Sequence, residues 1–266
     1  MSSLIDLYWH IFTLQVRSRF EYRADMVLGW CARILSYVCL YIAIWIIVER
    51  FEMIGGWVWV EIAFLLGFHM FAYAIGAALT FIQMRQLEEM VRQGQFEVLL
   101  VRPVNTWAYL VVSGLNLQYL GHLVLGFSLM IWALSNLDLV LSPLVTFQLV
   151  FSVVSAAMLT TALLTMLGAS ALLITRTRFF FGLFYDFWEL GRYPLVIFPW
   201  PLQALLLTAL PMGYTAFVPA AAVLGKEVPF WGDWASTAGM LAGPVFGGLA
   251  VLFWRFCLRK FEGVGG

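Results

Sequence analysis

Charged residues are scarce in this chain. Of its 266 residues, 11% are Asp, Glu, Lys or Arg, whereas 63% are apolar and 17% are aromatic. Soluble domains carry roughly 25% charged and 45–50% apolar residues, so a soluble fold is excluded and an integral membrane protein is indicated. The 15 basic and 15 acidic residues also cancel. Without an excess of positive charge, the chain is not expected to bind nucleic acid.

Motifs for metal binding and for catalysis are missing as well. Cys31, Cys39 and Cys257 have neither CxxC nor Cys/His spacing, so we expect reduced thiols instead of a disulfide framework or a metal site. The sequence contains no GxxxxGK(S/T), no HExxH and no GxSxG, the signatures of nucleotide-binding loops, zinc peptidases and serine hydrolases. We therefore expect no catalytic residue, no metal and no cofactor bound by this chain.

Apolar runs long enough to cross a bilayer follow one another along the chain. A hydrocarbon core of about 30 Å requires roughly 20 helical residues. The pattern predicts an all-α integral membrane protein with six transmembrane helices in a single domain, 1–266. Five of the expected spans are residues 26–48, 57–83, 107–134, 143–174 and 231–255. His69, near the middle of the second, is expected to be packed and hydrogen-bonded.

The sixth span has two alternative placements. Residues 179–199 are apolar and aromatic, yet they include Asp186, Glu189 and Arg192, which recur every three residues. This spacing places them on roughly one helix face, where Glu189 and Arg192 could pair. Two placements stay open: a span lined on one side by protein or water, or a helix lying at the interface.

Two segments are expected to contact the membrane without crossing it. Residues 1–25 combine a helical apolar stripe with three arginines, which is typical of a helix in the headgroup plane. Repeated prolines leave two short apolar helices, 202–210 and 214–224, each too short to cross. A re-entrant hairpin over 200–224 fits this pattern.

Residues 84–104, MRQLEEMVRQGQFEVLLVRPV, form a charged stretch between two apolar ones, with six of the chain's thirty charged residues. Met84, Leu87 and Val91 recur at i, i+3 and i+7, which predicts an amphipathic helix, and Gly94 is expected to end it. Such a helix suits docking into the groove of a soluble partner. The alternative is a solvated loop lying on lipid headgroups.

Basic residues are distributed unevenly between the two sides of the spans. Eleven of the fifteen lie in the N-terminal segment, in 84–104, in 175–178 and in the C-terminal tail, whereas Arg50 and Lys226 lie opposite. The positive-inside rule therefore predicts that both termini and 84–104 are cytoplasmic. Arg33 lies within the first span, where it either snorkels back to the basic interface or faces a polar path.

Small residues recur at four-residue spacing in two spans. Gly239, Gly243 and Gly247 form overlapping GxxxG steps in the last span. A second stripe, Ala157, Thr161, Thr165 and Ala169, lies in the fourth. Both predict close helix packing.

Three segments together resemble a known family. GQFEVLLVRPV (94–104) is similar to the G-x-(I/L/F)-(E/D)-x-L-L-x-(R/K)-P loop of permease subunits in the type-2 ATP-binding-cassette exporter superfamily, in a branch of paired bacterial permeases. RYPLVIFP (192–199), followed by Pro211 and VPA (218–220), agrees with the same branch. So does the tail FEGVG (261–265), in which Phe and Val replace the Tyr and Ala common there.

The resemblance implies a half-transporter in the bacterial inner membrane that exports its substrate. It would have six spans, an N-terminal interfacial helix, an extracellular re-entrant pair of short helices and a cytosolic coupling helix. The coupling helix would sit on a separate ABC ATPase, present in two copies, which would bind ATP and Mg. The second permease in the dimer would be an identical copy or a related chain.

The same resemblance makes 84–104 the coupling loop, with Glu97 and Arg102 as the main polar contacts to the ATPase. The expected coupling residues are Glu88, Glu89, Arg92, Gln95, Phe96, Glu97, Arg102 and Pro103.

The transport pathway is expected between the two permeases, lined by spans one and five. The side chains predicted to line it are Arg33, Tyr37, Tyr41, Asp186, Glu189 and Arg192. This mixed, aromatic and lightly charged chemistry permits lipids, peptides or amphiphilic small molecules. The alternative function is a non-transporting intramembrane enzyme or a membrane scaffold, which co-purification of a Walker-motif ATPase would distinguish.

Overall fold

The computed structural model describes residues 4–21, 23–174 and 176–263. Within these residues the chain folds into helices and connecting turns, with one isolated β-bridge between Ile54 and Trp57. Residues 1–3 and Tyr22 of the expected interfacial segment lie outside the described residues, as do Thr175 of the 175–178 loop and the last residues of the FEGVG tail.

Five helices are long and apolar enough to cross a membrane in the described part of the chain, where six were expected. α2 (Arg23–Phe51), α3 (Trp59–Arg92), α7 (Pro143–Ala169) and α11 (Ala235–Lys260) provide four of them. The fifth is Leu117–Asn136, the 3-10 turn η1 (Leu117–Tyr119) continued by α6 (Leu120–Asn136). Ser142 caps α7 by accepting a hydrogen bond from the Val145 amide at 3.3 Å, with Pro143 in the first turn.

The prediction of one uninterrupted third span, 107–134, is wrong. α5 (Thr106–Ser113) ends at Gly114, and α6 begins only after a short irregular segment. The amide of Asn116 there donates to the carbonyl of Ala78 on α3 at 3.0 Å, while its side chain accepts from the Gln118 amide at 3.1 Å. Asn competes for backbone partners in this way, so the helix breaks where Asn116 bonds to α3.

The segment predicted as the sixth span is also interrupted. α8 (Arg178–Leu190) has 13 residues, a rise of about 20 Å, and Gly191 and Pro194 follow it. The 3-10 turns η3 (Leu195–Ile197) and η4 (Pro211–Thr215) and the short helices α9 (Trp200–Leu207) and α10 (Phe217–Val223) come next. Two short helices therefore lie close to the positions expected for the hairpin.

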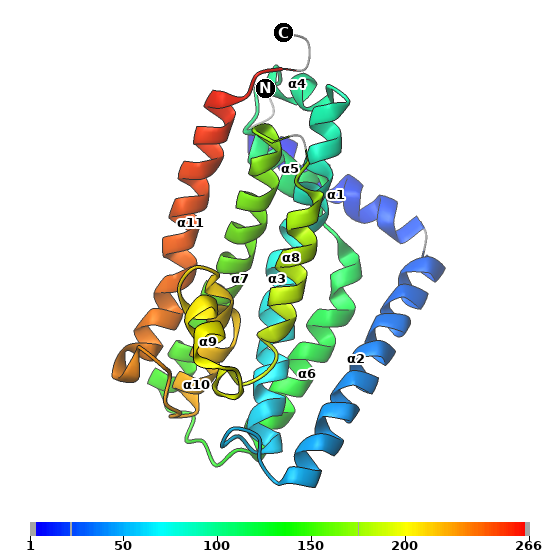
Figure 1. The fold of residues 1–266 in the computed structure, drawn as a ribbon. Coiled ribbons are helices and arrows are strands. Elements are labelled where there is room, and N and C mark those ends of the chain that lie inside the picture. The colour runs from blue at the N-terminus through cyan, green and yellow to red at the C-terminus, as the bar shows by residue number, and fades with distance from the viewer. Residues whose placement is uncertain (1–3, 22, 175, 264–266) are drawn as a thin grey trace.

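The C-terminal end of α11 (Ala235–Lys260) lies at the end of the molecule that carries α4 (Gln95–Leu100) (Figure 1). α7 and α11 both run toward that end, so the chain must return to the opposite end between them. α8 covers only part of this return, and the irregular segments through η5 (Gly232–Trp234) complete it. α1 (Leu4–Glu21) runs across the long helices instead of along them, as a helix in the headgroup plane would.

Small residues bring the helices of the core into backbone contact. A Cβ on Gly76 of α3 would lie 2.6 Å from the Ala157 carbonyl oxygen of α7, and one on Gly243 of α11 would lie 2.1 Å from the Ser155 carbonyl oxygen. The Ser155 hydroxyl also accepts from the Gly243 amide and donates to the Gly239 carbonyl, at 2.9 and 2.7 Å. The Ser155 hydroxyl thus bridges the Gly243 amide and the Gly239 carbonyl, which a regular helix would join directly. Gly243 immediately precedes Pro244 in α11.

The other two glycines of the GxxxG pattern have different neighbours. A Cβ on Gly239 would lie 3.4 Å from Pro219 of α10, and one on Gly247 would lie 3.7 Å from the Met158 methyl group. The three glycines therefore do not form one uniform helix–helix seam, and Gly243 has the closest contact.

Candidate functional site

The charged stretch 84–104 begins as a continuation of α3. The expectation of a separate amphipathic helix is corrected here, because α3 runs without a break to Arg92 and Gly94 follows with φ +71°. Met84 and Leu87, on the apolar face, are buried within this chain. Met84 packs against Gly168, where an added Cβ would lie 2.6 Å from the Met84 Cβ. The apolar face of this helix is thus already covered.

Glu88 links the end of α3 to the start of α8. Its Oε2 accepts hydrogen bonds from the backbone amides of Thr177 and Arg178, both at 2.7 Å, and from the Thr177 hydroxyl at 3.2 Å. A carboxylate at a helix N-terminus satisfies unpaired amides and complements the helix dipole. Glu88, predicted as an ATPase contact, therefore has an internal partner.

α4 forms the tip of the molecule and is anchored from below. Phe96 and Leu99 are buried, and the Phe96 ring lies 6.5 Å from that of Trp254 on α11 and 5.4 Å from that of Phe261. Phe96, also predicted as a partner contact, is 0% exposed. It holds α4 against the end of α11 instead.

The outer side of α4 combines exposed apolar and polar residues. Val98, Leu100 and Val101 are exposed, and so are the predicted coupling residues Gln95, Arg102 and Pro103. Arg102 donates a hydrogen bond to the Tyr109 hydroxyl at 2.9 Å. We call Gln95, Val98, Val101, Arg102 and Pro103 the α4 tip.

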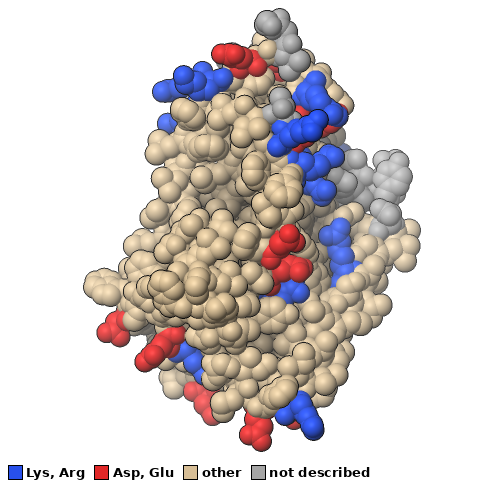
Figure 2. Space-filling model, in the orientation of Figure 1, with Lys and Arg blue, Asp and Glu red and all other residues tan. Residues whose placement is uncertain are grey.

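The other three predicted coupling residues lie beside the tip. Glu89 forms an ion pair with Arg92 on the exposed side of α3. Glu97 is half-buried, and its Oε1 lies 2.7 Å from the position of a Cβ on Gly263. The eight predicted residues thus gather at one end of the molecule, where Figure 2 shows many of the blue side chains.

A cavity of about 500 Å³ opens between α2, α3, α6 and α8. Four of the six residues predicted for the pathway line it, namely Arg33, Tyr37, Glu189 and Arg192. Tyr41 is buried in the apolar core, and the exposed Asp186 is not part of the lining.

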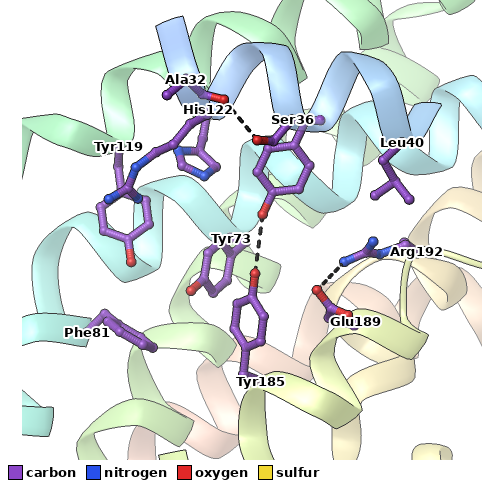
Figure 3. Close-up of a pocket in the computed structure, with 12 residues that line it drawn as sticks. Ala32, Ser36, Leu40, Tyr73, Phe81, Tyr119, His122, Tyr185, Glu189 and Arg192 are labelled. Carbon is purple, nitrogen blue, oxygen red and sulfur yellow. Dashed lines mark hydrogen bonds and ion pairs between the residues drawn. The ribbon is translucent and has the colours of Figure 1, made fainter. Parts of the chain in front are cut away.

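Polar contacts fix several of these side chains. Arg33 donates to the Gln118 side-chain oxygen at 3.0 Å and so faces the cavity. Arg192 forms an ion pair with Glu189 at 2.7 Å (Figure 3), with the Arg192 side chain 8% exposed. The pair expected from the sequence is present, but Arg192 lies beyond the end of α8, so the three charged residues do not share one helix face.

Sequence reasoning missed the other eight residues of this lining, among them Tyr73, Tyr119, His122 and Tyr185. Figure 3 shows them converging on the cavity; Tyr73 comes from α3, Tyr119 and His122 from the continuous η1–α6 segment, and Tyr185 from α8. The Tyr185 hydroxyl lies 3.5 Å from that of Tyr37. The His122 ring lies 5.2 Å from the Tyr37 ring. A signal was available in the spacing of Tyr119 and His122, which puts a tyrosine and a histidine on one helix face.

His69 is buried and hydrogen-bonded, as expected. Its Nε2 is 3.0 Å from the Trp188 carbonyl oxygen, and the two rings stack at 4.3 Å. Among the described residues, no group of three His, Cys, Asp or Glu side chains is placed to hold a metal ion. The cavity offers guanidinium and hydroxyl donors between aromatic walls, which suits binding of a ligand.

Comparison with known families places these features in context. A family model described as "ABC-2 family transporter protein" matches residues 34–265 of the chain. The match includes both the α4 tip and almost all of the cavity lining. Neither the curated proteins nor the solved structures gave a match.

Proposed function

The chain belongs to the ABC-2 transporter family, and on that premise we propose that it is the permease subunit of an ATP-driven exporter of the bacterial inner membrane. In this proposal two permeases, identical or related, assemble with two copies of a separate ABC ATPase, which binds ATP and Mg. The multi-pass membrane location and the permease role follow from the family. Export, the dimer and the coupling to the ATPase belong to the proposal.

The α4 tip is the observation that carries the proposal. Val101, the residue that directly follows α4, is 83% exposed, and Val98 and Arg102 are exposed as well. Exposed apolar side chains rimmed by polar ones mark protein interaction sites. Phe96 and Leu99 fasten α4 to the chain from the inner side, so a partner that pushes on the tip would move α4 together with the end of α11.

Charge supports a cytoplasmic position for this end. Arg85, Arg92 and Arg102 lie in or beside the α4 segment, and Arg176 and Arg178 follow α7, which runs toward the same end. The α11 C-terminus, with Arg255, Arg259 and Lys260, lies there too. The positive-inside rule then places both termini and α4 in the cytoplasm, where ATP is available.

Glu88 supplies a route from the α4 tip to the cavity. It joins the cytoplasmic end of α3 to the first residues of α8, and the far end of α8 carries Tyr185 and Glu189, which line the cavity. We propose that displacement of α4 by the ATPase moves α8 through this link. The proposal has six crossings. Five are the helices α2, α3, α6, α7 and α11, and the sixth is the return from α8 to η5, within which α9 and α10 form the re-entrant pair.

Co-purification with a Walker-motif ATPase tests the proposal. We expect Val98→Asp/Val101→Asp to reduce the amount of bound ATPase at least tenfold, because two carboxylates would have to be buried unpaired. Val140→Asp is the matched control. Val140 is 84% exposed, in the loop between α6 and α7 at the opposite end (Figure 1).

ATPase binding that survives both the double substitution and replacement of 95–103 by Gly and Ser would disprove the contact. Sidedness gives a second test. A cysteine at position 98, in a chain whose native Cys31, Cys39 and Cys257 are replaced, should react with an impermeant maleimide only after the cells are opened. Reaction in intact cells would overturn the cytoplasmic assignment.

A further inference from the structure

Three cavities adjoin one another along α8, from the α4 end toward the middle of the bundle. The 500 Å³ cavity shares Phe81 and Tyr185 with a second of about 370 Å³, which is also lined by Arg85 and Arg178. A third of about 660 Å³ shares Arg178 with the second and opens among Arg92 and Arg176. We call these three neighbouring cavities together the α2–α8 groove.

Arginines dominate the ionised side chains of the groove. The six that line it are Arg33, Arg85, Arg92, Arg176, Arg178 and Arg192. Figure 2 shows blue side chains following one another down this face, with red ones beside them near its middle.

The two carboxylates that line the groove are already engaged. Glu189 is paired with Arg192, and Glu88 is bonded to the backbone amides of α8. Asp186, also on α8, is exposed and outside the lining. Among the described side chains, none lies within ion-pair distance of Arg33, Arg85 or Arg178, although Arg178 interacts electrostatically with Glu88 and Glu89. Arg33 and Arg85 therefore supply positive charge in the groove that no carboxylate of the described residues pairs.

Arg33 distinguishes the groove from an ordinary basic membrane border. Arg85 and Arg178 are exposed near the cytoplasmic end, as headgroup-facing arginines often are. Arg33 is half-buried within α2, turned to the 500 Å³ cavity and held by Gln118. Both Arg33 and Arg85 act electrostatically on Tyr119, so the buried and the exposed charges share a neighbourhood.

The remaining walls of the groove are aromatic and apolar. Tyr37, Tyr73, Phe81 and Tyr185 line it, with Leu40 on α2. The Tyr37–Tyr185 contact, at 3.5 Å, is the one hydrogen bond that joins α2 to α8 among the described residues. Little therefore holds this side of the groove closed against the surrounding lipid.

We propose that the α2–α8 groove binds an amphiphile with an anionic head group, the substrate class of the transporter. The head group lies against Arg33, Arg85 and Arg178, because guanidinium groups form strong charge-assisted hydrogen bonds with phosphate and carboxylate. The apolar part lies along the aromatic wall and leaves between Tyr37 and Tyr185. The 500 Å³ cavity is within the 300–1,000 Å³ or so typical of small-molecule sites.

Binding can be measured on the full chain alone, in neutral maltoside micelles. The probe is 11-(dansylamino)undecanoate, whose fluorescence rises in an apolar site, and competitors displace it. We expect dodecyl phosphate to compete at least tenfold better than either inorganic phosphate or dodecyltrimethylammonium. Phosphatidylglycerol forms a further arm. Its competition would identify a two-chain bilayer lipid as the ligand, and competition by dodecyl phosphate alone would identify a single-chain amphiphile.

Substitutions locate the site. Arg33→Gln and Arg85→Gln should each weaken probe binding about tenfold, which corresponds to about 1.4 kcal/mol. Arg33→Lys should restore part of the loss. Arg50→Gln is the matched control, since Arg50 is an exposed arginine at the other end of α2. Circular dichroism of each variant separates loss of binding from loss of folding.

Equal competition by the anionic and cationic amphiphiles, or by phosphate and dodecyl phosphate, would overturn the proposal. So would undiminished binding in a folded Arg33→Gln/Arg85→Gln chain. The inference rests on the proposed function only for the statement that the ligand is transported, because the binding assay contains no ATPase. Binding without ATPase co-purification would leave the site standing and overturn the proposal of an exporter driven by a separate ATPase.

Discussion

In the half of the bundle formed by α3, α7 and α11, backbone lies directly against backbone, whereas α2 and α8 meet across a groove through their side chains. A Cβ at Gly76 or Gly243 would collide with a main-chain oxygen of α7. The only hydrogen bond between α2 and α8 in the described chain is a long one between two tyrosines. Direct backbone contact therefore holds the first half, whereas side chains around a cavity of about 500 Å³ separate α2 from α8.

We propose that this difference selects the elements that move in the transport cycle. Segments that rearrange during function come from the less stable parts of a protein. Tyr37 and Tyr185 line the groove from α2 and α8, whereas Tyr73 and Arg85 line it from α3. In this proposal the α3–α7–α11 half is the frame against which α8 is displaced, and Glu88 lies at the junction, on a frame helix and bonded to the start of α8.

The largest effect is expected from breaking the frame. Gly243→Ala would place a methyl group 2.1 Å from the Ser155 carbonyl oxygen, and relief requires α7 and α11 to separate. We expect the free energy of unfolding to fall by about 3 kcal/mol, the upper end for overpacking. Thermal unfolding in detergent, followed by circular dichroism, measures the change.

Gly248→Ala is the control on the same helix. No atom lies within 4 Å of its added Cβ, and alanine is favoured over glycine in a helix by about 1 kcal/mol. That variant should unfold at the same temperature or higher. If the two alanine variants behaved alike, the frame would not depend on the close contact at Gly243.

The frame was more accessible from the sequence than the groove. The start of α7 at Pro143, the helix end before Gly94 and the close approach at Gly243 follow from local rules for caps, glycine and small residues. The break in the third span does not, because it depends on Asn116 bonding to Ala78, a residue on another helix. Composition alone cannot identify such a partner.

The residues of the groove show the same limit of prediction from sequence. Arg33 and Arg192 stood out as charges within apolar runs, so a pattern could find them. Tyr73, Tyr119 and Tyr185 did not, because tyrosine is common in membrane proteins and only the packing of α3, α6 and α8 brings these three together. For Phe96 the sequence pattern was misleading instead of silent. Its position in the loop motif predicted contact with a partner protein, but its ring packs against Trp254 at the end of α11.

An intermediate effect is expected at the junction. Glu88→Ala removes the carboxylate from three donors of Thr177 and Arg178. The loss of a helix cap costs about 1–2 kcal/mol, and we expect that destabilisation together with faster amide exchange at the start of α8. In the assembled transporter, ATP hydrolysis should continue while its stimulation by substrate declines.

Glu89→Ala provides the comparison for Glu88. Glu89 is paired only at the surface, with Arg92 and Gln93, and such pairs contribute about 0.2–1 kcal/mol. It should leave α8 exchange unchanged. An identical response of the two variants would mean that the link between frame and α8 does not run through Glu88.

The smallest effect is expected from the groove itself. Tyr37→Phe removes the hydroxyl that lies 3.5 Å from the Tyr185 hydroxyl and leaves the ring in place. A hydrogen bond of that length contributes at most about 0.5 kcal/mol, so thermal stability should hardly change. The same energy would make opening of the groove about twofold more frequent, which hydrogen exchange in α8 can detect.

Tyr41→Phe tests whether that response is specific. Tyr41 lies one turn further along α2, is buried in the apolar core and does not line the groove. Faster exchange of α8 in Tyr37→Phe alone would show that the tyrosine pair restrains the opening. Equal amide exchange in both variants and in the parent chain would mean that packing against α3 and α6, and not the tyrosine pair, holds α2 and α8 in place. The two halves of the bundle would then differ only in degree.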